Sequence, residues 1–356
     1  MRILLVRPTA SGGLAAHVDQ ELALLEAAGR DVHEAPVQIR ERPDLIGDLR
    51  TVRTLRRILR TPLPAENVQP ASAVSTAALA ATVHAHGLRA GALAAVAMWG
   101  LRRQHLVVTL HNRTIGSFVT RAVGGILLRV LAQRANTVLA VSPDLADTAR
   151  KAGARDVRHA IIPAPVQAAP APVPDAPDED RGRLDVLVIA RLAPQKGLHD
   201  LLDAAALLRD GAPVRIRVAG DGPLAQELSA RILAEQLPVE LLGRRDDVPA
   251  LLSACDLLVS AAQWEGQPVS LQEALGAGRA IVATDAGGTR CVTADAAYLV
   301  PVGDPAALAA AITTLQDPAL RSAAEHASRR RALELPTAED LLAQLDEVLA
   351  PGPRHW

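Results

Sequence analysis

The segment Ser260–Gly288 constrains the fold more than any other part of this chain. The apolar run Ala254–Ser260 predicts a buried strand, a turn follows at Glu265–Pro268, and Val269–Gly276 predicts a helix. A second apolar run, Ala280–Thr284, predicts the next strand. Strand, helix and strand in such close succession indicate a parallel α/β sheet, because the helix supplies the crossover that parallel strands need.

Two carboxylates make this unit a candidate ligand site. Glu265 lies in the turn, and Glu273 lies about one turn inside the helix on the side that looks back toward the turn. Between them, the start of the helix leaves backbone N–H groups unpaired at the positive end of the helix dipole, which suits a phosphate. Acids that hold hydroxyls and a helix end that holds phosphate fit the layout of a nucleotide sugar. Two solvated glutamates in an ordinary strand–turn–helix are the alternative.

A second candidate site is the loop R-L-A-P-Q-K-G, which runs from Arg191 to Gly197 after the apolar run Leu184–Ala190. Its guanidinium and ammonium groups can converge on one pair of phosphates. Among 38 Lys and Arg residues only two are lysines, Lys151 and Lys196, so a lysine in this loop stands out. An unliganded, charged loop after a strand is the alternative.

These loops resemble those of the retaining GT-B glycosyltransferases, glycosyltransferase family 4 in particular. E-G-Q-P-V-S-L-Q-E-A is similar to the family's E-x7-E signature, with the flanks W-E-G-x-P and A-G-x-x-I-V-A-T-D-x-G-G, and R-L-A-P-Q-K-G is similar to its R-x4-K-G. The resemblance extends over nearly the whole chain, from about Arg2 to Leu315. It implies an α/β protein of GT-B fold, with two Rossmann-like domains facing a cleft.

The resemblance also implies a domain organisation. The expected acceptor-side domain is 1–166, and the nucleotide-sugar domain is 184–335. A linker rich in Ala, Pro and acidic residues joins them at 167–183. The helix and tail at 336–356 are candidates to cross back to the first domain, although the helix lacks the aromatic residues often seen there.

Roles in the second domain follow from the same resemblance. Arg191 and Lys196 would stabilise the departing diphosphate, Glu265 would contact hydroxyls of the sugar, and Glu273 would hold ribose hydroxyls. The backbone of Gly12 and Gly13, after the first strand of the chain, would lie beside the sugar and phosphates. The backbone of Gly243 and Arg244 would hold the base. The other donor-binding residues are Gly266, Gln267, Pro268, Val269 and Ser270.

Four histidines are candidate site residues in the first domain. S-G-G-L-A-A-H-V places His17 on a helix, V-H-A-H-G places His84 and His86 at a strand end, and T-L-H-N places His111 after the next strand. Ligands collect at the carboxyl ends of parallel strands. The family resemblance makes His111 a catalytic residue beside the donor sugar and the other three acceptor-side residues. The alternatives are a surface position for His17 and a buried structural role for one of the other pair.

The activity implied is retaining transfer from a nucleoside-diphosphate sugar to an acceptor, which can be a sugar, a glycolipid or a small metabolite. We expect no cofactor and no metal, because no Asp-x-Asp site is visible, and no nucleic-acid partner. No second carboxylate is placed as a nucleophile, which favours front-face attack assisted by the donor phosphate. The alternatives are a nucleotide-sugar epimerase or hydrolase of GT-B fold, and a catalytically silent GT-B binding protein.

Composition favours a cytoplasmic protein. The start M-R-I-L-L-V-R-P predicts a short strand and not a signal peptide, and no apolar run is long enough for a bilayer span. The two cysteines, Cys255 and Cys291, form no metal or disulfide pattern. The segment Thr61–Thr76 has no clear period and is expected to be a long loop.

Charge divides unevenly along the chain. Residues 1–163 hold 21 of the 38 Lys and Arg but 12 of the 39 Asp and Glu, so this half carries +9 and the rest −10. The predicted helix Leu45–Leu59 is basic and amphipathic, with arginines at Arg50, Arg53, Arg56, Arg57 and Arg60. This pattern fits peripheral contact with an anionic membrane or acceptor. The alternative is a solvated outer helix in one of two docked domains of opposite charge.

Overall fold

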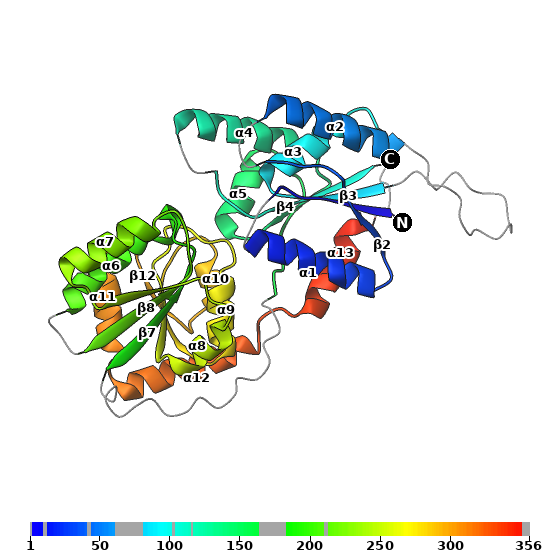
Figure 1. The fold of residues 1–356 in the computed structure, drawn as a ribbon. Coiled ribbons are helices and arrows are strands. Elements are labelled where there is room, and N and C mark those ends of the chain that lie inside the picture. Colours follow the sequence, from blue (N-terminus) through cyan, green and yellow to red (C-terminus); the bar gives the residue numbers. More distant parts are fainter. Residues whose placement is uncertain are drawn as a thin grey trace. The chain divides into compact units, whose positions relative to one another are not determined.

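The computed structural model describes residues 2–9, 13–40, 44–60, 81–101, 104–114, 117–163, 183–209 and 213–350. The chain divides into two compact units, the first made of residues 1–162 and 336–356 and the second of residues 163–335. Each unit holds one parallel six-stranded sheet with helices on its faces (Figure 1). The α/β fold class predicted from the sequence is therefore confirmed.

The first unit has the strand order β2-β1-β3-β4-β5-β6. Its strands are β1 (Arg2–Val6), β2 (Asp31–Glu34), β3 (Ala81–His86), β4 (His105–Leu110), β5 (Thr137–Ala140) and β6 (Val157–His159). Its helices are α1 (Gly13–Ala27), α2 (Leu45–Arg60), α3 (Leu88–Ala97), α4 (Phe118–Ala132), α5 (Pro143–Lys151) and α13 (Ala338–Leu349). Helices α2, α3 and α4 form one layer, and α1 and α13 lie on the other face of the sheet (Figure 1).

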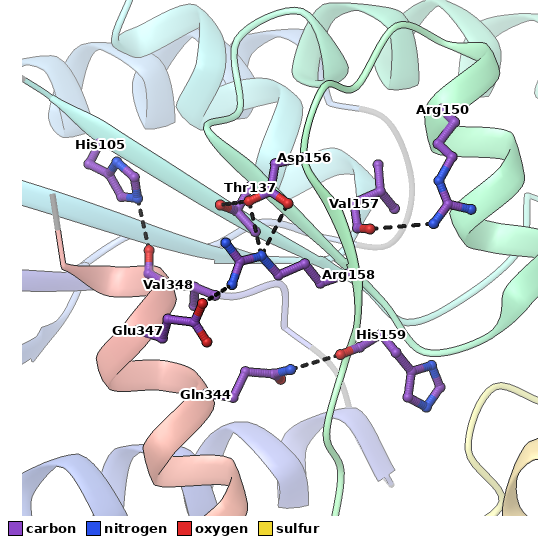
Figure 2. A network of polar contacts seen from close by, with 10 residues as sticks. All are labelled: His105, Thr137, Arg150, Asp156, Val157, Arg158, His159, Gln344, Glu347 and Val348. Atoms are coloured by element: carbon purple, nitrogen blue, oxygen red, sulfur yellow. Dashed lines mark hydrogen bonds and ion pairs between the residues drawn. The ribbon is translucent and has the colours of Figure 1, made fainter. Parts of the chain in front are cut away.

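Helix α13 belongs to the first unit although it follows the whole second unit in the chain. Its apolar stripe, Leu341, Leu345, Val348 and Leu349, is buried. Figure 2 shows the polar contacts beside that stripe: Gln344 donates to the carbonyl of His159 at 2.8 Å, and the His105 ring contacts the Val348 carbonyl at 2.8 Å. Arg158 and Glu347 form an ion pair in the same network. Packing of its apolar stripe and these polar contacts attach the helix, which itself contains no aromatic residue.

The second unit has the strand order β12-β11-β10-β7-β8-β9. Its strands are β7 (Leu184–Ile189), β8 (Val214–Ala219), β9 (Val239–Gly243), β10 (Leu257–Ser260), β11 (Ala280–Thr284) and β12 (Tyr298–Val300). Its helices are the 3-10 turn η2 (Pro194–Lys196), α6 (Leu198–Leu208), α7 (Ala225–Glu235), α8 (Val248–Ala254), α9 (Val269–Gly276), α10 (Thr289–Thr293), α11 (Pro305–Thr314) and α12 (Pro318–Ala332).

The apolar strands of this unit are buried on both faces, as expected for a parallel sheet. Along β7, Val186 and Val188 pack into one core cluster, and Leu187 packs into the cluster on the opposite face. Such alternation follows from the two-residue period of a strand. Core packing on both faces fixes the sheet, so the loops at its carboxyl edge rest on a rigid support.

The apolar run predicted as one strand at Ala254–Ser260 instead contains the end of α8 and the shorter strand β10, because an apolar run alone does not separate a helix end from a strand. The loop predicted at 61–76 lies outside the described residues, as does all but the last residue of the linker 167–183. Within the described part of the chain, no helix is both long enough and apolar enough to cross a membrane.

Candidate functional site

The second unit has a topological switch point between β7 and β10. The chain leaves β7 for β8 and β9 on one side, and β10 later pairs with β7 on the other side. After β7 and after β10 the chain therefore continues toward opposite edges of the sheet. The carboxyl edge at such a point is where open α/β sheets bind ligands. Both segments predicted from the sequence follow these two strands: the loop Arg191–Gly197 follows β7, and the turn Glu265–Pro268 follows β10.

The loop after β7 is held by close backbone packing. Gly197, which follows η2, has φ 61°, and a Cβ atom built on it would lie 1.8 Å from the carbonyl oxygen of Ala261. Gln263 also donates its N–H to the carbonyl of Gln195 at 2.9 Å. These contacts place the β7 loop directly on the β10 loop. Arg191 is exposed, and its side chain makes no hydrogen bond or ion pair to any described residue.

Lys196 and Glu265 form an ion pair across the two loops, between Nζ and Oε1. The Lys196 side chain is 21% exposed and that of Glu265 is 11% exposed. Gly288 supports the acid from the turn after β11, by donating its N–H to the Glu265 carbonyl at 2.9 Å. The sequence pointed to both residues separately but not to their pairing. A cation and an anion thus share one partly buried position at the switch point.

Helix α9 begins directly after Glu265 and its turn. Its N-cap is Pro268, and no side chain caps the helix. Its first turn therefore presents N–H groups, at Val269 and Ser270, that no side-chain cap satisfies. Glu273 lies half-buried one turn further along, while Gly266 is buried and Gln267 is half-buried in the turn. The positions predicted to bind phosphate and ribose thus lie on one short segment.

The loops after β8 and β9 complete this edge. Gly220 donates to the Gly243 carbonyl at 2.8 Å, and a Cβ on Gly220 would lie 1.9 Å from the carbonyl oxygen of Ala190. Gly243 has φ 68° and open space around it. The Arg244 side chain is exposed and lies 3.9 Å from Asp246. The two residues predicted to hold the base therefore lie at the carboxyl end of β9, which is two strands from β7 in the sheet.

The first unit gathers its four candidate histidines into one buried cluster. His17 comes from α1, His84 and His86 from β3, and His111 from the residue after β4; the four are between 0% and 8% exposed. His17 is therefore not a surface residue. Gly13 is the exposed first residue of α1, and Gly12 lies outside the described residues.

Glu21 is the centre of this histidine cluster, and the sequence did not point to it. Its side chain is fully buried on α1, one turn after His17. Oε1 lies 2.6 Å from Nδ1 of His84, and Oε2 lies 3.4 Å from Nε2 of His86. The spacing of four residues from His17 was the available signal, but it does not reveal contacts with another strand.

The carboxylate also orders the hydrogen bonds beyond it. His84 has both ring nitrogens engaged, since its Nε2 lies 2.8 Å from the hydroxyl of Thr109. His86 Nδ1 and His111 Nε2 lie 3.1 Å apart, so one of them donates to the other. A negative charge near His86 Nε2 favours a proton on that nitrogen, which makes His86 Nδ1 the acceptor and His111 Nε2 the donor. Nδ1 of His111 is then left as a hydrogen-bond acceptor.

Burial sets the protonation of the cluster. It lowers the pKa of His17 from 6.5 to about 4, lowers the pKa of His86, and lowers that of His111 well below 6.5. Burial alone would raise the pKa of Glu21, but the charges and hydrogen bonds of His84 and His86 hold it well below 4.5. At neutral pH the cluster contains a carboxylate and at least three neutral rings.

Neutral imidazoles and a carboxylate are also metal ligands. Two triplets have ligand atoms within 4.8 Å of one another: His17, His86 and His111, and Glu21, His84 and His86. The donor set suits a transition metal. However, Glu21 Oε1 already contacts His84 Nδ1, and His86 Nδ1 already contacts His111 Nε2, so an ion that used these atoms would compete with those hydrogen bonds.

Comparison with known proteins bears on both units. HepE of Anabaena, solved in complex with UDP, superimposes with a TM-score of 0.71 over 98% of this chain and 100% of its own, at 20% identity. Residues 3–165 match the family model for a glycosyl transferase 4-like domain, and residues 183–317 match the model for glycosyl transferases group 1. Glycosyltransferase family models thus match the greater part of both units, and the superposition shows a GT-B fold.

Curated relatives align with shorter parts of this chain. The putative colanic acid biosynthesis glycosyltransferase WcaL of Escherichia coli is 34% identical over 35% of this chain and 34% of its own length. The N,N'-diacetylbacillosaminyl-diphospho-undecaprenol alpha-1,3-N-acetylgalactosaminyltransferase of Campylobacter jejuni is 36% identical over 31% of this chain and 28% of its own. The chain thus aligns with about a third of the length of each of these relatives.

Proposed function

We propose that this protein is a retaining glycosyltransferase that moves a sugar from a nucleoside-diphosphate sugar to a hydroxyl of an acceptor without a metal. The observation that carries the proposal is the Lys196–Glu265 pair at the switch point, beside an exposed Arg191 and the uncapped start of α9. Cations and N–H groups there suit a diphosphate, and acids beside them suit hydroxyls.

Donor binding would exchange the partners of this ion pair. A diphosphate that enters beside Lys196 and Arg191 competes with Glu265 for the ammonium group. Glu265 is then released to accept hydrogen bonds from the sugar, while Glu273 accepts them from the ribose. Negative charge on the diphosphate grows as the glycosidic bond breaks, so the two cations stabilise the transition state more than the bound donor.

Retention of configuration is proposed by a front-face route. The one carboxylate found among the described histidines is Glu21, which is fully buried and held by His84, so it is poorly placed as a nucleophile. The acceptor hydroxyl would instead pass its proton to the departing diphosphate as it attacks from the same side. His111 is the proposed contact to the transferred sugar, with Nδ1 as its free acceptor.

The comparisons support a particular choice of substrates for the test. HepE was solved with UDP, and the name of the C. jejuni relative states a diphospho-undecaprenol acceptor. UDP-sugars are therefore the first donors to try. Lipid-linked sugars are the first acceptors, followed by soluble sugars and small metabolites.

The experiment incubates the protein with a panel of nucleotide sugars and measures nucleoside diphosphate release, with and without acceptors. We expect release from one donor, stimulation by an acceptor, and the donor's anomeric configuration in the product by NMR. Inverted configuration would refute the front-face route. Release that no acceptor stimulates would indicate a hydrolase, an isomerised donor an epimerase, and binding without release a silent GT-B protein.

A further inference from the structure

Exposed apolar side chains are concentrated on one layer of the first unit. Six large apolar residues of that unit are more than 60% exposed among those described, and all lie on α2, just after α3 or on α4. They are Leu45, Ile46, Trp99, Phe118, Val119 and Ile126. Figure 1 shows these three helices as one layer over the sheet. We call this surface the α2–α4 face.

Helix α4 presents the strongest apolar part of this face. Phe118 is 78% exposed, Val119 68% and Ile126 65%, and helical periodicity places them on one side of the helix. The chain has a single Phe and only three Trp. Phe118 and Trp99 are both exposed on the same layer of this aromatic-poor chain. Grouped apolar side chains of this kind mark an interaction surface, whereas single scattered ones are normal on any protein.

The charge on this face has a single sign over a long stretch of chain. From Asn67 to Pro143 the sequence contains seven arginines and no acidic residue or lysine. Arg121 and Arg129 are exposed on α4, beside the apolar side chains. The layer that holds α3 and α4 is therefore cationic and apolar at once.

Helix α2 extends the same character. Arg50, Arg53, Arg57 and Arg60 are exposed beyond the apolar residues at its start. Arg56 is different, because it donates to the carbonyls of Ala97 and Trp99, at 3.2 and 2.8 Å, and so attaches α2 to the end of α3. The acid Asp48 is neutralised by Arg89, whose Nη2 lies 2.7 Å from its Oδ1.

We propose that the α2–α4 face docks on an anionic lipid bilayer, with Phe118, Val119 and Ile126 entering the interface and the exposed arginines contacting lipid headgroups. Apolar and aromatic side chains flanked by basic residues are what an anionic interface binds. A purely electrostatic partner would leave the apolar side chains in water, and a second copy of so basic a face would be repelled. The inference extends the proposed function. It depends on that function in one respect only, namely that the enzyme meets its acceptor at a membrane.

The test is co-sedimentation of the full-length protein with vesicles of phosphatidylcholine alone or with added phosphatidylglycerol, at low and high salt. We expect binding to the anionic vesicles that falls with salt. The double variant Phe118→Ser and Ile126→Ser should weaken binding about 10- to 100-fold at both salt concentrations. The triple variant Arg53→Gln, Arg60→Gln and Arg121→Gln should weaken it about 100-fold at low salt and little at high salt.

A matched control comes from the second unit. Leu233 and Leu333 are 81% and 89% exposed there, so Leu233→Ser with Leu333→Ser removes equally exposed apolar groups elsewhere. The control should bind vesicles as the unaltered protein does, and all variants should release nucleoside diphosphate normally with a soluble acceptor. No binding to anionic vesicles, or binding that survives the Phe118 and Ile126 changes, would overturn the docking proposal. An effect of those two changes on self-association instead would assign the face to a second copy of the chain, and would also overturn it. Neither result touches the proposed transfer reaction, which the soluble assay measures separately.

Discussion

The buried histidine cluster predicts that the first unit loses stability in mild acid. Folded His17 binds its proton only below about pH 4, whereas the unfolded chain binds it below pH 6.5. Between these values the unfolded state holds more protons, so the free energy of unfolding falls as pH falls. A pKa lowered from 6.5 to about 4 corresponds to about 3 kcal/mol at about 1.4 kcal/mol per unit.

The other members of the cluster act in the same direction. The lowered pKa values of His86 and His111 add to the loss below pH 6.5. Glu21, whose pKa is held below 4.5, adds a further loss once the unfolded carboxyl begins to protonate below that value. Because native domains are stable by about 5–15 kcal/mol, the loss from His17 alone is already a substantial part of the stability of such a unit near pH 4.

Hydrogen exchange of the β3 and β4 amides, or calorimetry between pH 7 and 4.5, measures this dependence. The contribution of His17 alone corresponds to a fall in Tm of roughly 6–12 °C over the full range. In His17→Gln the free energy of unfolding should depend less steeply on pH, because up to one proton fewer is taken up on unfolding. The matched change His33→Gln, at an exposed side chain of β2, should leave it unchanged. A first unit whose stability is flat from pH 7 to 4.5 would show that the cluster titrates in the folded state, and the burial argument would be wrong.

Three further predictions concern the second unit and the reaction. Lys196→Ala should lower turnover by about 10²- to 10³-fold and cost about 1–3 kcal/mol of stability, because Glu265 loses its partner; Lys151→Ala, at the chain's other lysine, should change neither in the same transfer and unfolding assays. Transfer should persist in EDTA, because two cations and a helix end take the place of a metal; activity that EDTA abolishes and Mn²⁺ or Zn²⁺ restores would refute this and direct attention to the histidine cluster. Gly197→Ala should lower Tm much more than Gly303→Ala, because both glycines have positive φ but only Gly197 meets a neighbouring carbonyl, at 1.8 Å. Equal losses of Tm would mean that the clash is relieved by movement of the loop.

Local patterns made much of the second unit predictable. The Arg191 and Lys196 loop and the Glu265 to Glu273 segment are each short and continuous and each follow an apolar run, so local sequence placed them at the correct strand ends. The ion pair between Lys196 and Glu265 was not predictable, because it joins loops 69 residues apart that meet only when β10 pairs with β7.

The first unit shows the same limit more strongly. The histidines were found because they lie near strand ends or in the first part of a helix and stand in motifs that resemble the family's. Glu21 was missed because it reads as an ordinary polar position on an amphipathic helix, and its partners are two residues of β3. Arg56 was grouped with the outward arginines of α2, but it turns to carbonyls at the end of α3, which no helical period reveals.

The position of α13 in the chain has a consequence for synthesis. The second unit is one continuous stretch, so it can complete its sheet as soon as residue 335 has been made. The first unit, although translated first, then still lacks the helix whose Leu341, Leu345 and Val348 cover one face of its sheet. The apolar surface of β4 to β6 that α13 covers therefore stays exposed while the whole second unit is translated. The usual order, in which the N-terminal part of a protein finishes folding first, is thereby reversed. A fragment that ends at residue 162 would therefore keep this apolar surface exposed, because it never acquires α13.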